Sequence, residues 1–180
     1  GNVQICNCHE GKVIKKTLPD GGIATGQAFV MNLRRPKFSD PKVREAIGLL
    51  YNFEWSNESL FFGQYARVNS FWENSELAAE GKPSEGELAL LKPLAGDLPA
   101  GILDDEAVTA SVSGLRALDR KNLRVASKLL DEAGWLVGDD GLRRNSNGDL
   151  FSLEIIERSP AFDRVVLPYI DNLRAAVKAK

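Results

Sequence analysis

The apolar residues of the chain follow helical spacing in three long stretches. Ser39-Asp40-Pro41 offers an N-cap followed by proline at the first helical position, which predicts a helix beginning at residue 41. Asp119 is a good cap for residues 120–133, and Ser159-Pro160 begins a third helix, in which Pro168 predicts a kink or a restart. The positions predicted to face the interior are Val43, Ala46, Ile47 and Leu50 in the first stretch, Leu123, Ala126, Leu129, Leu130 and Ala133 in the second, and Phe162, Val165, Val166, Tyr169, Ile170, Leu173 and Val177 in the third.

Two shorter helices are predicted between the first two long ones. One spans residues 56–63, and we expect it to bury Leu60 and Phe61. The other opens at Ser84 and ends at the next proline, because Glu87 follows Ser84 at capping-box spacing.

Strand patterns complete the set of predicted elements. The apolar run over residues 23–35 predicts a largely buried strand. Residues 142–144 and 150–157 flank an Asn147-Gly148 turn and predict a hairpin. The mixture indicates a helix-rich α+β fold. Two stretches show no regular pattern, residues 65–83 and 95–118.

The composition argues against several classes of protein. The chain has 180 residues, of which 43% are apolar, and this is enough to bury a core. Its 23 Lys and Arg against 25 Asp and Glu give a formal charge of −2, which argues against a nucleic-acid clamp or a basic membrane-surface helix. No apolar run approaches the roughly 20 residues that cross a bilayer. Composition therefore indicates an ordinary globular protein and leaves its function to the motifs.

Cys6, Cys8 and His9 are the candidates for metal or catalytic chemistry. They place three possible soft ligands within four residues, but the chain has no other Cys or His to complete a tetrahedral zinc site. His9 is also the only imidazole available as a catalytic base. Acidic pairs such as Asp139-Asp140 are typical of a solvated surface. We therefore expect no metal and no cofactor, with a stand-alone metal-dependent hydrolase built on Cys6, Cys8 and His9 as the alternative interpretation.

Residues 61–75 combine aromatic side chains with arginine and asparagine. Such a mixture suits a recognition surface, because rings give a large contact area and polar side chains give directed hydrogen bonds. It equally suits a core cluster whose polar atoms hold an irregular loop. The residues alone leave both interpretations open.

The two ends of the sequence suggest a longer protein. The chain has no initiator Met, and the helical pattern of its last stretch continues almost to Lys180 with no Gly or Asn to close the helix. We interpret the chain as an excised piece of a longer protein.

Several ordered motifs resemble one known family. Residues 29–47 (FVMNLRRPKFSDPKVREAI) are similar to the signature of the extracellular solute-binding proteins of family 5, the periplasmic receptors for dipeptides, oligopeptides and nickel in ABC importers. Residues 53–67 and 70–84 resemble its YejA-like branch, which is linked to oligopeptide and microcin C uptake. Residues 120–135 and 167–173 are also typical of the family. The resemblance covers about residues 10–177.

The resemblance implies a type II periplasmic-binding-protein fold, of which this chain is a part. Residues 1–35 would be a strand beside the hinge that leaves the first lobe. Residues 36–180 would form a partial second lobe, similar to domain 3 of dipeptide-binding proteins and packed as one compact unit. The implied function is that of a receptor, not an enzyme, which captures peptides between two lobes and delivers them to permease subunits.

The resemblance also implies a ligand, a location and a site. The ligand is an oligopeptide or a peptide conjugate, bound by the full-length protein in the periplasm, with or without an anchor to the inner membrane. Phe29, Met31 and Asn32 are expected near the ligand or the hinge. In the competing interpretation, Asn32 and Arg34-Arg35 only hold the hinge and the start of the helix. The family favours packing within the lobe for residues 61–75, and no nucleic-acid partner is expected.

Overall fold

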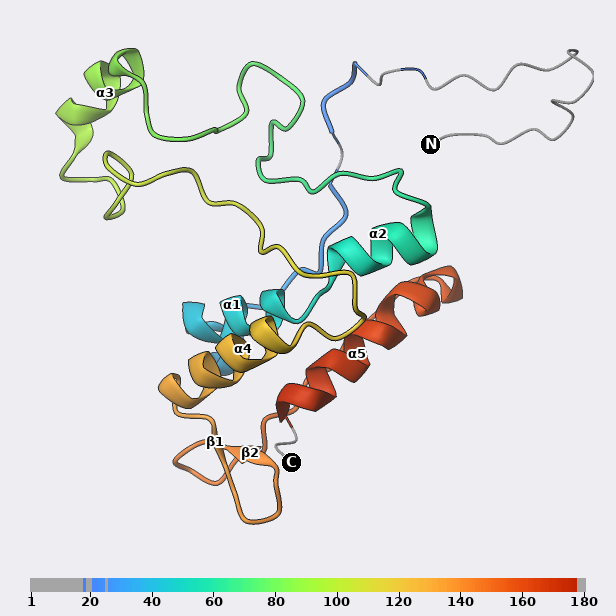
Figure 1. Ribbon diagram of the computed structural model, residues 1–180. Helices are drawn as coiled ribbons and strands as arrows, with labels where there is room; N and C mark the ends of the chain where they lie inside the picture. The colour runs from blue at the N-terminus through green and yellow to red at the C-terminus, as the bar shows by residue number, and fades with distance from the viewer. Residues whose placement is uncertain (1–17, 19–20, 25, 178–180) are drawn as a thin grey trace, which may run out of the picture. The chain divides into compact units, whose positions relative to one another are not determined.

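The computed structural model describes Leu18, residues 21–24 and residues 26–177. Helices dominate this part of the chain, with one small two-stranded sheet (Figure 1), so the predicted helix-rich α+β composition is confirmed. The elements are η2 (Pro36–Phe38), α1 (Pro41–Leu49), α2 (Phe53–Phe61), α3 (Glu85–Leu91), η3 (Lys92–Leu94), α4 (Arg120–Glu132), β1 (Leu136–Val137), β2 (Arg143–Arg144), η4 (Pro160–Phe162) and α5 (Asp163–Val177).

The contacts divide the described residues into two compact units. The first contains the residues up to Ala28 together with residues 66–110, and the second contains residues 29–65 and 111–177. The predicted boundary at residue 35, with residues 36–180 in one lobe, stays a prediction.

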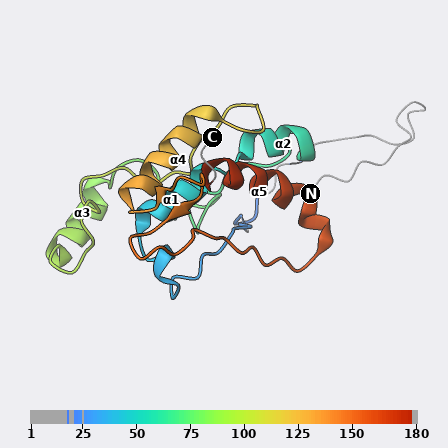
Figure 2. The same cartoon turned by 90° about the horizontal axis from the view of Figure 1, so that it is seen from below.

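Helix α1 packs against α4 at the centre of the second unit (Figure 1 and Figure 2). Ala46 and Ala126 are completely buried, and their small side chains let the two helix backbones approach closely. Helix α5 packs against α4 and α2 and adds Tyr169 and Leu173 to this core. The remaining core members are Val43, Ile47, Leu50, Leu130, Phe151 and Ala176.

Most of the predicted interior positions are confirmed. Leu123, Leu129, Ala133 and Val177 are partly buried against the core, in addition to the fully buried members. Phe162 is an exception, because it lies in η4 before α5 begins and is 42% exposed.

The predicted helix ends follow the capping rules. Asp40 accepts a hydrogen bond from the backbone N–H of Lys42 at 2.8 Å, and Pro41 is the first residue of α1. Ser84 and Glu87 form both bonds of the capping box at the start of α3. The predicted break at Pro93 becomes a change to the 3-10 helix η3. Helix α5 continues through Pro168 as one element, so the predicted restart there is wrong.

Helix α2 begins earlier than predicted. Its N-cap is Asn52, whose side chain accepts from the N–H of Trp55 at 2.9 Å. The expected first residue, Ser56, instead lies one turn inside the helix and donates its hydroxyl to the Asn52 carbonyl. Ser56 is the buried residue of α2, whereas Leu60 and Phe61 are only half-buried.

The strand predicted over residues 23–35 is wrong. Val30 is 91% exposed and Leu33 is 59% exposed, and the described part of the segment is irregular backbone. A strand exists only when a neighbouring strand satisfies its backbone groups, and the described sheet consists of β1 and β2 alone.

The predicted hairpin is partly confirmed. Gly148 has φ +85° and donates to the Asn145 carbonyl, as the predicted turn requires. However, β2 pairs antiparallel with β1, which precedes it, and it joins the predicted second arm through a single bridge between Arg144 and Leu150, with a 2.8 Å bond from the Phe151 N–H to the Arg143 carbonyl. The predicted alternation of buried and exposed residues begins as expected in that arm, since Phe151 is buried and Ser152 is exposed, although the arm forms no extended β-ladder.

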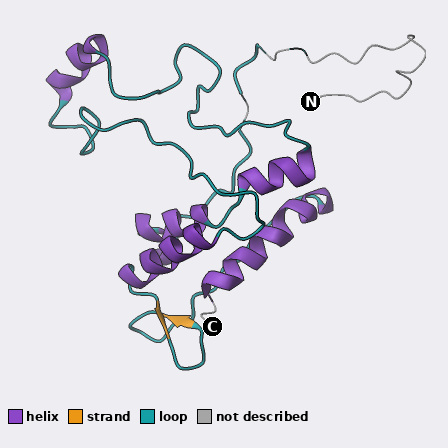
Figure 3. Cartoon of the chain, in the orientation of Figure 1, coloured by secondary structure: helices purple, strands orange, loops and turns teal. Residues whose placement is uncertain are grey.

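The first unit is mostly loop around α3 (Figure 3). Its backbone turns are tied by bonds from Ala24 N–H to the Glu73 carbonyl (3.0 Å) and from Ala107 N–H to the Gly81 carbonyl (2.7 Å). The irregular structure predicted for residues 65–83 and 95–118 is confirmed.

Three buried asparagines fasten residues 112–117 to the helices of the second unit. Asn52 donates to the carbonyls of Gly114 (2.9 Å) and Arg116 (2.7 Å). Asn122 donates to the Val112 carbonyl at 3.1 Å, and Asn172 donates to the Ala117 carbonyl at 2.8 Å. These side chains thus satisfy the carbonyls of a loop that pairs with no strand and belongs to no helix, and this fixes the path of the loop.

Arg143 is the one buried cation of the described core. Its side chain is 2% exposed and donates to the Asp131 carboxylate and to the carbonyls of Trp135 and Ala176. The Ala176 carbonyl lies in the last turn of α5, where helix carbonyls lack partners and positive charge is favourable. Arg143 therefore joins α4, β2 and the end of α5.

We predict that Arg143→Met lowers the free energy of unfolding by about 2–4 kcal/mol, because buried carbonyls lose their donor and Asp131 loses its partner. Urea unfolding measures the loss. The matched control is Arg174→Met, whose ion pair with Asp171 is 67% and 72% exposed and is worth less than about 1 kcal/mol. Equal losses in the two variants would contradict this role of Arg143.

Asp119 generates a prediction about pH. Its carboxylate accepts from the N–H groups of Asn122, Gly114 and Lys121, and these bonds, that to Asn122 foremost, hold its pKa below the ordinary value. A lowered pKa stabilises the fold above the unfolded pKa of about 3.9, and this stabilisation is lost as the pH falls through the folded pKa.

We therefore expect Asp119→Ala to cost about 1 kcal/mol at neutral pH and less at acidic pH, because the native carboxylate becomes protonated as the pH falls through its lowered pKa. Urea unfolding at both pH values tests this expectation. Asp139→Ala removes an exposed carboxylate that caps no helix, and it should unfold like the wild type at both values. A difference for Asp119→Ala that does not change with pH would contradict the argument.

Candidate ligand-binding segment

Phe29 lies in a cluster of three aromatic rings. Its ring centroid is 5.6 Å from that of Tyr51 and 5.0 Å from that of Tyr169, and the two tyrosine rings are 5.4 Å apart. Tilted and edge contacts at these distances are favourable. The ring of Phe29 is nevertheless 40% exposed, so one side of it faces solvent.

The same cluster ties α5 to the end of α1. The buried Tyr169 hydroxyl donates to the Ile47 carbonyl at 2.8 Å, and Asn172 donates to the Leu50 carbonyl at 3.1 Å. Both acceptors lie at the C-terminal end of α1, where helix carbonyls need outside donors. Burial raises the pKa of Tyr169 far above its ordinary value, so its hydroxyl is a permanent donor.

Met31 packs against the core, whereas Asn32 forms hydrogen bonds in a surface turn. Met31 is partly buried against the core, so it anchors the segment. Asn32 is exposed, and its side-chain oxygen accepts from the backbone N–H (3.1 Å) and the Nε (3.2 Å) of Arg34. Its carbonyl accepts from the N–H of Arg35 at 3.0 Å. Asn32 therefore shapes the turn that leads into η2, as the competing interpretation requires, while its side-chain NH₂ faces no acceptor among the described residues.

The segment after Asn32 lies beside residues 152–154. Arg35 pairs with Glu154 at 3.2 Å, and Lys37 donates to the Ser152 carbonyl. Partial burial, then the nearby charge of Arg35, lowers the pKa of Lys37. These contacts hold the turn against residues 152–154 of the same unit, although the two segments form no β-ladder.

Residues 29–34 thus form a surface segment with a fixed base and an open face. Phe29 and Met31 attach it to the core, while Val30, Leu33 and Arg34 are exposed. Its exposed groups are apolar side chains, an amide and a guanidinium. They suit contact with a peptide, which offers apolar side chains, amides and a carboxylate, and they contain no nucleophile with an adjacent base.

Residues 61–75 divide into two parts with different roles. Phe61 packs edge-on against Tyr65 at 4.9 Å and lies under Arg164, whose guanidinium carbon is 5.4 Å from the ring centroid. This part serves packing. Phe71 and Trp72 belong to the other unit and are 97% and 50% exposed, so packing does not account for their rings.

Cys6, Cys8 and His9 lie outside the described residues. Within the described part of the chain, no group of three or more His, Cys, Asp or Glu is arranged to hold a metal ion. The acidic pair considered from the sequence has a structural use, since Asp140 pairs with Arg144 at 2.8 Å. That hydrogen bond lowers the pKa of Asp140. None of the described helices has the length and apolar character to cross a membrane.

Comparison with known proteins decides the family. A model described as bacterial extracellular solute-binding proteins, family 5 Middle, matches residues 11–178. The chain belongs to this family. The resemblance carried by residues 29–47 and the later motifs is therefore confirmed, and family 5 implies a periplasmic-binding-protein fold and a binding role.

The relatives agree with the YejA-like branch. "Probable peptide-binding protein YejA" of Agrobacterium fabrum is 38% identical over 167 residues, which are 92% of this chain and 27% of that protein. YejA of Escherichia coli K12 is 38% identical over 146 residues, 81% of this chain and 24% of that protein. "Peptidoglycan-binding protein YepA" of Agrobacterium fabrum is 36% identical over 167 residues, 92% of this chain and 27% of that protein. The chain thus spans about a quarter of the length of these relatives.

The family resemblance singled out Phe29, Met31 and Asn32 from the sequence. The structure adds Tyr51 and Tyr169, which the resemblance did not indicate and which complete the aromatic cluster with Phe29. Arg34, named from the sequence in the competing interpretation, is the residue whose Nε donates to Asn32. Tyr169 was predicted only as an interior residue. Its hydroxyl contact with α1 joins segments 122 residues apart in sequence, which local patterns do not reveal.

We predict that Phe29→Ala lowers the free energy of unfolding by about 1–2 kcal/mol, less than for a fully buried ring because part of Phe29 is exposed. Val30→Ala is the matched control, since Val30 is 91% exposed and should change stability by less than about 0.5 kcal/mol. Urea unfolding gives both values, and near-ultraviolet circular dichroism reports the tyrosine environment. Phe29→Ala with wild-type stability and spectrum would show that the aromatic cluster does not hold this segment.

Proposed function

We propose that the chain is part of the substrate-binding component of an ABC-type oligopeptide import system. The observation that carries the proposal is the family 5 match over residues 11–178, supported by a relative named for peptide binding. The open face of residues 29–34 agrees with a ligand of mixed apolar and polar character. The protein works in the periplasm, captures its ligand between two lobes and delivers it to the permease subunits.

Within this proposal, residues 36–180 belong to the second lobe and residues 1–35 to the hinge-side segment. Phe29 and Asn32 lie at the ligand or the hinge, with Met31 as their anchor. The anchored base and exposed upper face of the segment support this role, because a binding surface needs fixed geometry together with accessible groups.

A second ligand class is favoured by the relative named for peptidoglycan binding, which is 36% identical to the chain. Peptidoglycan carries short peptides on its sugars, so one peptide-recognising surface suits both classes. We therefore propose a short peptide as the recognised group, either free or attached to a peptidoglycan fragment.

The main test measures peptide affinity by isothermal titration calorimetry. We predict that the full-length protein binds free oligopeptides or a disaccharide-linked peptide with micromolar or tighter affinity, whereas the 180-residue chain binds at least about 100-fold more weakly because one face of the cleft is absent. Fluorescence of Trp55, Trp72 and Trp135 follows the same titration. Equal affinities for the two proteins, or no affinity in the full-length one, would contradict the proposal.

The same preparations test the alternative of a metal-dependent hydrolase on Cys6, Cys8 and His9. That alternative requires stoichiometric zinc after chelation and re-addition, and loss of peptide hydrolysis in His9→Ala. We expect neither, with peptide affinity unchanged in His9→Ala. Metal-dependent hydrolysis that disappears in this variant would replace the binding proposal with the enzyme.

A further inference from the structure

The outer face of α4 carries a row of positive charge. Arg120, Arg124 and Lys128 follow one another at intervals of four residues, so they lie above one another on the helix surface. All three are exposed, and Lys121 lies next to the first of them. At 1.5 Å per residue the row is about 12 Å long. We call these three residues the α4 basic row.

The row violates the local rules for a stable helix. Arg120 and Arg124, and then Arg124 and Lys128, are like charges at four-residue spacing, which repel each other. The first turn of a helix favours acidic residues and the last turn favours basic ones, yet α4 has the reverse order in its helical residues, with Asp131 and Glu132 at its end. Asp119, the N-cap residue just before α4, is the one acidic group that lies at the favourable end of the helix, and the charge of Lys121 lies close to its carboxylate.

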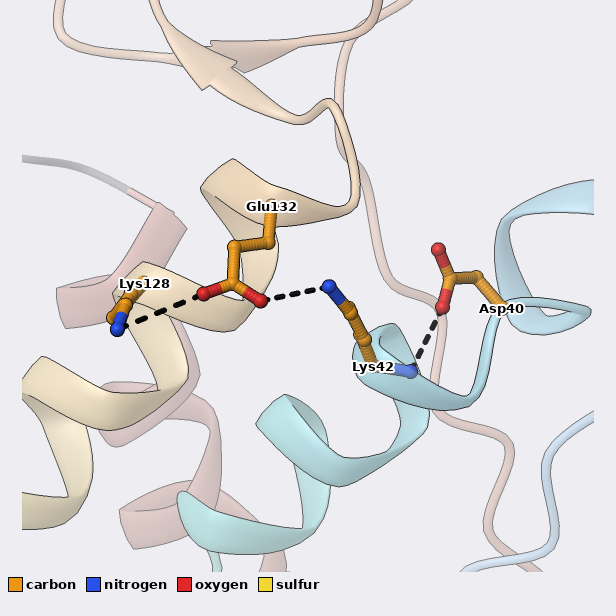
Figure 4. Close-up of polar contacts among 4 residues, drawn as sticks. All are labelled: Asp40, Lys42, Lys128 and Glu132. Carbon is orange, nitrogen blue, oxygen red and sulfur yellow. Dashed lines mark hydrogen bonds and ion pairs between the residues drawn. The ribbon is translucent and has the colours of Figure 1, made fainter.

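The acidic end has an explanation within the fold, whereas Arg120 and Arg124 of the basic row have none among the described residues. Asp131 pairs with the buried Arg143. Figure 4 shows that Glu132 lies between Lys42 of α1 and Lys128 of its own helix. The distances are 2.7 Å to Lys42 and 3.7 Å to Lys128, so Glu132 is mainly the partner of Lys42.

Arg120 and Arg124 form no ion pair or hydrogen bond through their side chains with any described residue. Lys128 is 79% exposed and has only the longer contact to Glu132. Residues that oppose local stability and lack an internal partner are expected at functional surfaces, since the compensating interaction is then made with another molecule.

We propose that the α4 basic row is a docking surface for an acidic patch on a protein partner. The inference rests on the proposed function in one respect: the partner would be a membrane subunit of the transporter. Carboxylates about 6 Å apart would match the spacing of the row and relieve its self-repulsion. The surface is separate from residues 29–34, so ligand binding and docking use different residues.

A protein partner fits the row better than a lipid surface. Helices that lie on membranes combine basic residues with large apolar ones that enter the lipid, whereas Val125, at 41% exposure, is the large apolar residue exposed on α4. The formal charge of −2 also repels the chain as a whole from anionic lipid. A small basic row on a slightly acidic protein favours a local acidic patch as its target.

The test compares two charge-reversed variants of the full-length protein. One carries Arg120→Glu, Arg124→Glu and Lys128→Glu, and the control carries Lys82→Glu, Lys92→Glu and Arg158→Glu, three other exposed cations whose reversal changes the net charge equally. Binding is measured to the membrane subunits in phosphatidylcholine nanodiscs and to empty nanodiscs rich in phosphatidylglycerol. Thermal unfolding and peptide affinity are measured on the same samples.

We expect the α4 variant to bind the membrane subunits at least about tenfold more weakly and to lose the salt dependence of binding, while the control stays within about twofold of the wild type. The unfolding midpoint of the α4 variant should stay close to that of the wild type, because acidic residues suit the start of a helix while the three new glutamates still repel one another. A lower midpoint with unchanged docking would assign the row a structural role and overturn the inference.

Two further outcomes are also decisive. Binding of the wild type to empty anionic nanodiscs, abolished by the α4 variant, would replace the protein partner with a lipid surface. If the full-length protein docks through the α4 basic row but binds no peptide, the docking surface is supported and the proposed function is overturned. If the wild type binds peptide but does not dock to the membrane subunits, the proposed function is supported and the docking surface is overturned.

Discussion

The close packing of α1 on α4 is the constraint on which the second unit depends. Ala46 and Ala126 are fully buried, and side chains this small let the rest of each helix face make contact. The same approach brings Lys42 at the start of α1 to Glu132 at the end of α4. Because η2 and residues 29–35 lead directly into α1, the position of α1 also fixes where the candidate ligand-binding segment lies. A larger residue at either alanine would displace the segment together with the helix.

Helices were predictable because their signals are local. Asp40, Ser84 and Asp119 cap helices by contacts within three residues along the chain, and the interior positions of α1, α4 and α5 follow one helical period. Strands were less predictable, since they need partners that are distant in sequence. Residues 23–35 have the apolar composition of a strand but pair with no described strand, and β2 forms its ladder with β1 and only a single bridge with the arm after Gly148.

The polar residues that hold the fold were not predictable for the same reason. Nothing in the sequence around Asn52, Asn122 or Asn172 indicates that their amides satisfy the carbonyls of residues 112–117. The sequence around Arg143 likewise does not indicate that its side chain is buried and donates to three acceptors. For the candidate site, the family resemblance supplied Phe29, Met31 and Asn32, and the structure added how they differ: two are attached to the core and the third shapes a turn.

Hydrogen–deuterium exchange of the full-length protein, with and without a bound oligopeptide, tests the central claim most directly. The account predicts that α1, α4 and α5 are protected in both states, because their packing does not depend on the ligand. It predicts that residues 29–35 exchange quickly without peptide and are protected when the peptide binds. Peptide binding that leaves exchange in residues 29–35 unchanged would contradict the claim that this segment belongs to the ligand-binding surface.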